Sequence, residues 1–452
     1  MAATRNGRRL GAGVAAALLA SAGAAGAGEF DFNPYAAVQY MYDSNVYRFS
    51  SQVADVTGTT ETADRSLRYL AGSDAGYTWQ QQKLQVMGEV RHIRFDQFSY
   101  LDHGEYALGS AFDGAILSNT KVLLHARDER RMASFEDRRS TQLVIERDQT
   151  GRGELAVAVT PAWQVVTGAR GRNLRSPLPA APALPQPPPG APARPASPDF
   201  GMHEAGFNLG ARYGIDNKEH PELEAPLLFG LVLDYQIVSF SGVTRQTEPP
   251  PPDPPLPLPL PTPPGEAHNQ FQDYQVLTLQ ATMRYAVSGV SLLDAKLGLA
   301  QFNPERSSAE SRPEGTGEVG YTRKVSPITE INAHLFRRIV PYVATADATT
   351  DSGISVGARW EPIRDLTVLG DYSWASSAFE GLSAFAPENA GRSDDVQNAA
   401  LSVAYPSRKM FYVRLFSTFS DRKSNLGYND YNDITAGVEL SFRLSPLKPG
   451  AE

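Results

Sequence analysis

Charged side chains recur at every second position inside otherwise apolar stretches of the sequence. Glu89 and Arg91 are two positions apart, and so are Asp294 and Lys296. In an extended chain, residues two apart point to the same side. Rings of such charges around a shared aqueous space act on ions and polar solutes. The full candidate set is Glu89, Arg91, Arg127, Asp294, Lys296, Glu330, Arg359, Asp371, Arg414 and Glu439.

These charges have two interpretations. In the first, opposite charges pair across the space they enclose and hold water there. In the second, they form a path for a polar polymer, with tyrosine and arginine as platforms for stacking and hydrogen bonding. Because both signs occur, the sequence predicts no strong preference for anions or for cations.

Local motifs of catalysis and metal binding are absent from the sequence. It contains no G-x-S-x-G, no H-E-x-x-H and no P-loop, and its seven histidines are scattered. It has no cysteine, which excludes disulfides and thiolate metal sites. Asp421 and Asp430–Asp433 could bind a divalent cation weakly, but a solvated acidic loop is the favoured interpretation. We therefore predict that the protein is not an enzyme and needs no cofactor or metal.

The elements that must position the charges are strands with one apolar side. In Asn432–Leu444, Ile434 and Leu440 lie on one side, and Glu439 and Arg443 lie on the other. Such a pattern covers a core in a soluble sandwich, whereas in a membrane barrel the apolar side faces lipid. The candidate strands run to about 10–14 residues, which suits a tilted strand crossing a bilayer. The pattern therefore favours a membrane barrel.

The connections between these strands alternate between short and long. Short turns occur at residues 288–289 and 326–327, and long polar connections at 303–314 and 380–393. Bacterial outer-membrane barrels have short periplasmic turns and long extracellular loops. The sequence thus predicts an all-β fold, a single transmembrane antiparallel barrel of about 18 strands (roughly 16–20) with both ends in the periplasm. The first strand is expected at 33–49, and the charge-dense residues 132–153 as a long loop that carries strand extensions.

The two ends of the sequence and two proline-rich runs complete the organisation. Residues 1–27 read as a signal peptide, with a basic start, an apolar run and the cleavage-type sequence Ala25-Gly26-Ala27. Residues 28–452 then form the barrel, in the bacterial outer membrane. The runs 176–200 and 248–265 hold 10 and 11 of the 34 prolines, so both are predicted as loop insertions. They are either tolerated loops or docking segments for a partner with an aromatic groove.

Phe32–Phe49, with its tyrosine-rich stretch and the element Asp43-Ser44-Asn45, resembles the opening of a family of outer-membrane β-barrel porins. Gly76–Trp79 also fits that pattern, while the proline-rich runs depart from it. The nearest branch is the EpsL-like outer-membrane proteins of exopolysaccharide biosynthesis operons. The resemblance implies export or assembly of exopolysaccharide, with polysaccharide as cargo and the periplasmic polysaccharide-export machinery as partner, besides outer-membrane lipid.

Three functions are therefore compatible with the sequence. The first is a porin-like barrel that takes part in exopolysaccharide export, and the second is a general diffusion porin for small polar solutes. The third is a non-conducting scaffold barrel whose proline-rich loops bind partners at the surface. The net charge of -8 argues against nucleic acid as a main partner.

Overall fold

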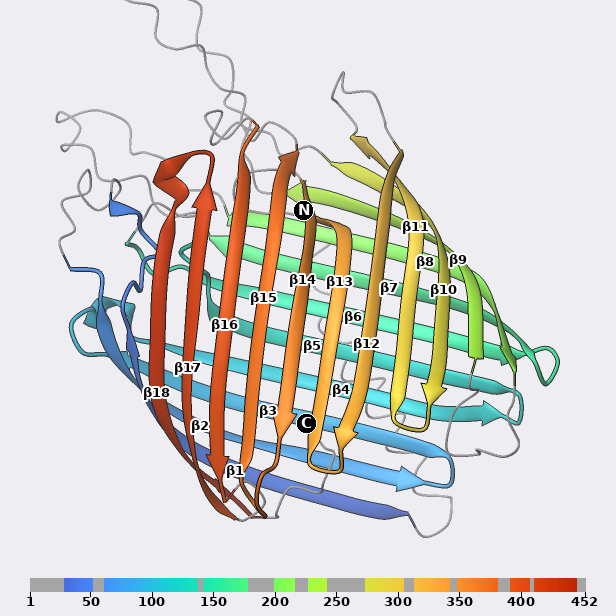
Figure 1. Cartoon of the computed structure of the whole chain (residues 1–452), viewed down its shortest axis with the longest axis horizontal. Coiled ribbons are helices and arrows are strands. Elements are labelled where there is room, and N and C mark those ends of the chain that lie inside the picture. Colours follow the sequence, from blue (N-terminus) through green and yellow to red (C-terminus); the bar gives the residue numbers. More distant parts are fainter. Residues whose placement is uncertain are drawn as a thin grey trace, which may run out of the picture.

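Eighteen antiparallel strands form one sheet that closes on itself (Figure 1). The computed structural model describes residues 28–51, 61–136, 141–177, 199–215, 227–241, 273–304, 313–341, 348–380, 391–406 and 410–444. Strand β1 (Glu29–Asp43) pairs with β2 (Asp64–Trp79) on one side and with β18 (Tyr431–Arg443) on the other, which closes the barrel. Closure leaves no strand edge unpaired, as the hydrocarbon interior of a membrane requires. The predicted all-β barrel of about 18 strands is confirmed.

Every strand pairs with its neighbours in sequence, so the topology is a simple up-and-down meander. The other strands are β3 (Gln82–Phe95), β4 (His103–Leu117), β5 (Thr120–Met132), β6 (Ile145–Ala158), β7 (Trp163–Pro177), β8 (Asp199–Ile215), β9 (Leu227–Ser241), β10 (Tyr274–Ser288), β11 (Ser291–Pro304), β12 (Pro313–Ser326), β13 (Thr329–Pro341), β14 (Ala348–Trp360), β15 (Thr367–Glu380), β16 (Ser393–Tyr405) and β17 (Phe411–Ser424). Two 3-10 turns, η1 (Ser99–Leu101) and η3 (Gly427–Asn429), lie in connections. No helix within the described ranges is long and apolar enough to cross a membrane.

The lengths of the connections orient the barrel. Residues 80–81, 118–119, 289–290 and 327–328 join strands at one end, whereas 44–63 and 133–144 join strands at the other. Short turns mark the periplasmic end of such barrels and long loops the extracellular end. The start of β1 and the end of β18 both lie at the periplasmic end, as predicted.

The burial of alternate side chains identifies the two faces of the sheet. In β1, Val38 and Tyr40 are exposed while Ala37 and Met41 are buried. Side chains converge on the concave side of a closed sheet, so the buried set marks the lumen. Directly opposite residues of paired strands point to the same side. The register therefore shows which residues of every strand face the lumen and which face outward. The outer face carries a band of exposed apolar side chains, among them Leu231, Leu279 and Leu297.

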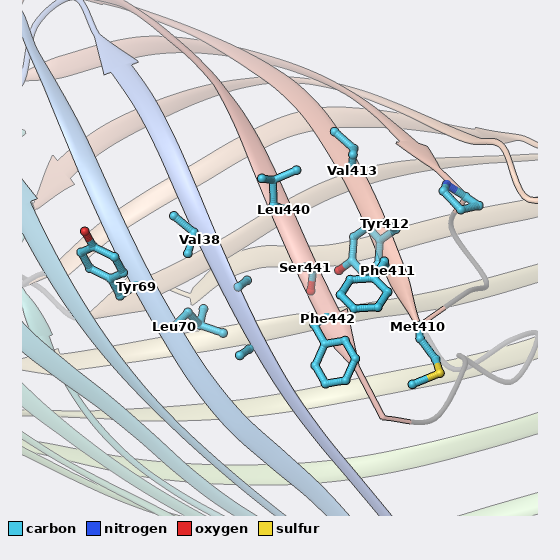
Figure 2. A pocket seen from close by; sticks show the side chains of 13 residues that line it. Val38, Tyr69, Leu70, Met410, Phe411, Tyr412, Val413, Leu440, Ser441 and Phe442 are labelled. Atoms are coloured by element: carbon cyan, nitrogen blue, oxygen red, sulfur yellow. The ribbon is translucent and has the colours of Figure 1, made fainter.

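The outer face is apolar even where the chain closes. A groove of about 1280 Å³ lies over the strands β1, β2, β17 and β18 (Figure 2). It is bordered by Val38, Tyr69, Val413 and Leu440, and the rings of Phe411 and Phe442 lie 4.7 Å apart beside it. Apolar side chains facing outward around a closed barrel are the arrangement that lipid demands. The protein is therefore an outer-membrane β-barrel.

Three predicted boundaries differ from the structure. The first strand ends at Asp43, and residues 44–50 leave the sheet as a folded segment instead of extending it to residue 49. The stretch 132–153 was predicted as a long loop that carries strand extensions, and strand β6 takes up residues 145–153 of it. The ends of the run 176–200 belong to strands and not to the predicted loop insertion, because β7 continues to Pro177 and β8 starts at Asp199. The predicted signal peptide (residues 1–27), the rest of that run and the run 248–265 lie outside the described residues.

Candidate functional site

The strand register places all ten predicted pore-facing residues on the lumen side of the sheet. Glu89 lies opposite Gly72, which lies opposite Tyr35 on the inner face of β1, and Arg91 is two residues further on. The other eight follow the same alternation from strand to strand: Arg127, Asp294, Lys296, Glu330, Arg359, Asp371, Arg414 and Glu439. Whether they line a conducting path remains a proposal.

Most of these ten form ion pairs along the wall. Arg414 contacts Glu439 at 2.5 Å, and Lys296 contacts Glu318 at 3.0 Å. Arg91 bridges Glu89 and Glu105. Three more pairs are Arg127 with Glu129 (2.9 Å), Arg359 with Glu361 (3.0 Å) and Asp294 with Arg284 (3.6 Å). The interpretation in which charges pair and hold a hydrated wall therefore describes most of the predicted set.

A luminal chamber of about 1130 Å³ is bounded by the inner faces of β1–β8 and β18. It contains one of the ten predicted residues, Arg127. Its basic side chains are Lys83, Arg127, Arg152, Arg170, Arg172 and Arg443, and its acidic ones are Asp31, Asp74 and Glu204. Arg127, Arg170 and Arg172 form ion pairs with carboxylates, so the basic side chains of the chamber without an ion pair in the described chain are Lys83, Arg152 and Arg443.

Arg170 is the centre of the largest network in this wall. Its guanidinium donates two parallel hydrogen bonds to Asp234, at 2.6 and 2.9 Å, and one to Glu204 at 3.1 Å. A fourth goes to Gln236 at 3.1 Å. The planar fork of arginine matches a carboxylate in this two-bond geometry, which fixes the side chain in direction. Three neighbouring strands, β7, β8 and β9, are tied together by it.

Other arginines repeat this arrangement on the same side of the barrel. Arg172 holds Asp148 with hydrogen bonds of 2.6 to 3.1 Å, and Arg212 donates to Glu154 at 3.0 Å. Both pairs join strands that are neighbours or next neighbours in the wall. Fixed arginines of this kind present a rigid polar surface to a passing solute.

Arg152 differs from these arginines. It is exposed to the chamber between His125 on β5 and Arg170 on β7, which lie directly opposite it in the register. No carboxylate of the described chain lies within 4 Å of its guanidinium. Its charge is therefore available to a solute, as is that of Lys83 on β3.

An aromatic platform borders the chamber near its periplasmic end. The guanidinium of Arg443 lies over the rings of Tyr35 and Tyr412, 5.7 and 5.4 Å from their centres. It also donates a hydrogen bond to the Tyr412 hydroxyl at 3.2 Å, and the Tyr35 hydroxyl donates to Glu89 at 2.8 Å. Stacked rings and guanidinium planes of this kind suit planar or ring-shaped polar solutes.

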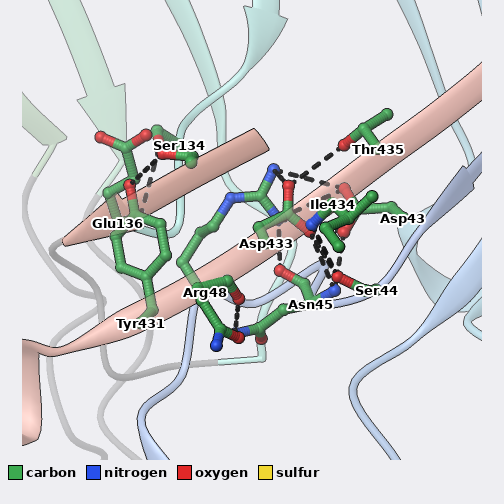
Figure 3. Close-up of polar contacts among 12 residues, drawn as sticks. Asp43, Ser44, Asn45, Arg48, Ser134, Glu136, Tyr431, Asp433, Ile434 and Thr435 are labelled. Carbon is green, nitrogen blue, oxygen red and sulfur yellow. Dashed lines mark hydrogen bonds and ion pairs between the residues drawn. The ribbon is translucent and has the colours of Figure 1, made fainter. Parts of the chain in front are cut away.

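The segment that follows β1 is attached to the inner face of β18 at the extracellular end of the barrel (Figure 3). Asp433, on the inner face of β18, accepts hydrogen bonds from the Ser44 hydroxyl and the Asn45 backbone, both at 3.1 Å. Arg48 forms ion pairs of 3.0 Å with Asp433 and with Asp43. Burial lowers the pKa of Arg48, but the Asp43 and Asp433 carboxylates raise it more, so the net shift is upward. The segment is thus fastened to the wall with its guanidinium charged.

Next to these ion pairs and hydrogen bonds, loop residues pack as a small apolar core. Tyr47 lies between Phe49, Phe98 and Phe135, with ring centres 4.9 to 5.4 Å apart, and it packs over the inner-face residues of β3. The loop after β5 reaches across the mouth, because Arg422 on β17 donates to the backbone oxygen of Glu136 at 3.1 Å. Three connections, 44–51, 96–102 and 133–136, therefore cover part of the extracellular mouth.

The acidic residues at this mouth act as hydrogen-bond acceptors and ion-pair partners. Asp430 accepts a hydrogen bond from the Ser424 backbone at 2.6 Å, and Asp433 forms the ion pair with Arg48 described above. Asp421 lies 3.5 Å from Lys423. Across the described ranges no group of three or more candidate metal ligands comes together. The weak cation site considered for these residues has no support in the geometry.

Sequence reasoning missed the arginine network of β6–β9. Asp148 and Arg152 alternate with outward residues in the stretch 132–153, which was predicted as a loop carrying strand extensions. The two-residue period was present in that stretch, but the outward positions include Arg147 and Gln149, which hid the apolar side. Arg170 and Asp234 lie 64 residues apart in the sequence, and only the register brings them together.

Comparisons with known proteins give structural resemblances only. No protein-family profile matches the sequence, and no curated protein matches it. The outer-membrane protein OpdK of Pseudomonas aeruginosa is 10% identical, with a TM-score of 0.42 over 91% of this chain and 99% of that chain. OccK9 (OpdG) of the same organism is 15% identical, with a TM-score of 0.43 over 92% and 99%. OccK2 (OpdF), solved in complex with glucuronate, is 12% identical, with a TM-score of 0.43 over 93% and 99%.

Proposed function

We propose that this porin-like barrel is a diffusion porin for small polar solutes and that it favours anions. The observation that supports the proposal is the luminal chamber of about 1130 Å³, whose arginines are exposed or held at fixed positions. Small-molecule sites occupy about 300–1,000 Å³, so a space slightly larger than this range has room for a small molecule together with water. Folded loops at the extracellular mouth narrow the path, which disfavours bulky cargo.

The anion preference follows from which charges are free. Arg152 and Lys83 face the chamber without a carboxylate of the described chain in ion-pair range. The guanidinium of Arg443 lies over two tyrosine rings and forms no ion pair within 4 Å in the described chain, although its charge interacts with that of Asp74. An excess of unpaired positive charge along a passage attracts anions and repels cations. The proposed anion preference goes beyond the sequence-based expectation, which predicted no strong preference because charges of both signs occur.

Planar-bilayer recording with an Arg152→Glu variant tests the proposal. In a KCl gradient, the reversal potential of the wild-type barrel should shift from zero toward the equilibrium potential of chloride. The variant should lower the anion-to-cation permeability ratio by about fivefold, which corresponds to ~1 kcal/mol of ion interaction in water. Arg323→Glu is the matched control, because Arg323 faces outward at the periplasmic end of β12. A reversal potential that is equal in all three proteins contradicts the proposal, and absence of any conductance favours the scaffold interpretation.

Exopolysaccharide passage is a second and narrower candidate function. The platform of Arg443 between Tyr35 and Tyr412 favours it, because sugar rings stack on aromatic faces. A deletion strain separates the two functions. Loss of secreted polysaccharide with unchanged uptake of small solutes supports export, whereas reduced uptake with normal polysaccharide supports the diffusion porin.

A further inference from the structure

Three arginines form a continuous row on the outside of the barrel. Arg130 on β5 lies directly opposite Arg147 on β6, and Arg147 lies directly opposite Arg175 on β7. Directly opposite residues of antiparallel strands have Cβ atoms about 4.5–5.5 Å apart. Each lies two residues from the extracellular end of its strand and on the outer face. The row therefore crosses the upper rim of the lipid-facing surface.

Like charges in this arrangement are unfavourable unless something compensates them. Opposed like-charged pairs destabilise a sheet, and here two such pairs adjoin. Arg147 is compensated by Asp128 on the outer face of β5, with a hydrogen bond of 2.8 Å from its Nε. Asp128 is further held by Gln149 at 3.1 Å and Tyr106 at 3.4 Å.

Arg130 and Arg175, on either side of Arg147, are exposed. Within the described chain, no carboxylate lies in ion-pair range of either guanidinium. One acidic side chain thus serves three cations. Two of the three positive charges in the row therefore have no carboxylate partner in the described chain. The guanidinium groups of the row lie on the outer face, away from the lumen.

The basic surface extends to neighbouring strands. Arg94 on β3 lies opposite Leu67 on β2, two residues from Arg65, and both arginines are exposed on the outer face. Below the row, the outward positions of β5 are Val122, Leu124 and Ala126, which suit acyl chains. The surface therefore combines an apolar lower part with a cationic upper part. This combination matches an amphiphile whose headgroup carries negative charge.

We propose that the row Arg130–Arg147–Arg175 binds the phosphorylated headgroup of a lipid in the outer leaflet of the outer membrane. A phosphate group accepts paired hydrogen bonds from the planar arginine fork and neutralises the repulsion along the row. The acyl chains then lie on the apolar outer face of β4–β7. This inference concerns the outside of the barrel and does not depend on which solute the lumen passes.

The experiment uses the folded full-length barrel in a non-ionic detergent. Its ligands are lipid A with both phosphates, the same lipid with the phosphates removed, and inorganic phosphate alone. The wild type should bind the phosphorylated lipid about 10-fold more tightly than the dephosphorylated one, since each basic residue near a charged lipid surface contributes about 1 kcal/mol. Inorganic phosphate should bind far more weakly than the lipid.

Variants assign the binding to the row. Arg130→Gln with Arg175→Gln should reduce the affinity for phosphorylated lipid about 30-fold, and the Lys pair at the same positions should reduce it less. The control Arg323→Gln with Lys423→Gln removes two outward charges from β12 and β17 and should leave binding unchanged. Heat-dependent gel mobility verifies that each variant is folded.

Three results would overturn the proposal. One is equal affinity for the two lipids, and another is inorganic phosphate binding as tightly as lipid A. The third is an affinity of the variant with Arg130→Gln and Arg175→Gln that equals the affinity of the control. Each of these outcomes assigns the arginines to a different role from lipid recognition.

Discussion

Arginine has three different roles in this barrel, and the surroundings decide which one applies. Arg170 is fixed by two carboxylates and carries no net attraction for a solute. Arg152, one strand away, faces the same chamber without a carboxylate in the described chain. Arg130 is equally exposed but points outward. Position in the register, more than residue type, determines what each guanidinium does.

Removing Arg170 should destabilise the barrel, and removing Arg152 should not. Arg170→Ala leaves the carboxylates of Asp234 and Glu204 close together without their partner. Uncompensated charges in a half-buried site cost about 1–3 kcal/mol. Thermal unfolding in detergent should show a lower midpoint for Arg170→Ala and an unchanged one for Arg152→Ala. Equal midpoints for the two variants would show that the network contributes nothing to stability.

The side on which each charged residue lies was predictable from the sequence, but its partner was not. Facing depends only on the two-residue period of a strand, and Glu89, Lys296 and Glu439 follow it. Pairing depends on how far neighbouring strands are shifted against each other. Arg414 and Glu439 lie on successive strands that are joined by a folded connection, so their meeting requires the register of β17 with β18.

Among the elements, strand β6 shows where the alternation of apolar and polar residues stops being informative. Its inner positions carry Glu146, Asp148 and Arg152, and its outer positions near the extracellular end carry Arg147 and Gln149. Above the hydrocarbon layer a strand needs no apolar side, so charge on both faces is compatible with a sheet. Strand pairing with β5 and β7 maintains the extended chain there.

The segment after β1 shows the opposite case, in which a strand-like sequence leaves the sheet. Residues 44–49 include Val46, Tyr47 and Phe49, which favour a strand, yet the chain turns at Ser44 and Arg48 adopts a φ of 54°. A positive φ costs free energy for a residue with a side chain, and the ion pairs of Arg48 with Asp43 and Asp433 offset that cost. The element Asp43-Ser44-Asn45 is thus the anchor of the mouth segment.

Releasing this anchor should widen the extracellular mouth. Asn45→Ala removes side-chain hydrogen bonds to Phe49 at 2.9 and 3.1 Å and to the Asn432 oxygen at 3.1 Å. Each lost bond weakens the folded segment by about 1 kcal/mol. Single-channel recording should show a larger conductance, and limited proteolysis should cut faster near residue 50. Asn119→Ala, in a periplasmic turn, is the control and should behave like the wild type. Unchanged conductance would falsify the idea that this segment restricts the path.

At the scale of the whole molecule, closure between β1 and β18 determines which surface meets lipid. These strands are about 390 residues apart along the chain, yet they pair over nine residues from Tyr35–Arg443 to Asp43–Thr435. The even strand number follows from returning both ends to the same side of the membrane, which is why counting strands in the sequence sufficed. Between its two rims, the wall then separates a polar interior from an outer band of apolar side chains.

This separation predicts that the same substitution has opposite consequences at adjacent positions. Leu279 faces lipid in the middle of β10, between Leu233 and Leu299, while its neighbour Gln280 faces the lumen. An arginine on the lipid face near the membrane midplane costs about 2–4 kcal/mol, whereas the lumen can hydrate it. Reversible urea unfolding in lipid vesicles should therefore show Leu279→Arg destabilised by that amount and Gln280→Arg by much less. Equal losses for both variants would mean that the face assigned here to lipid is in contact with water, and the barrel would then not span a membrane in this orientation.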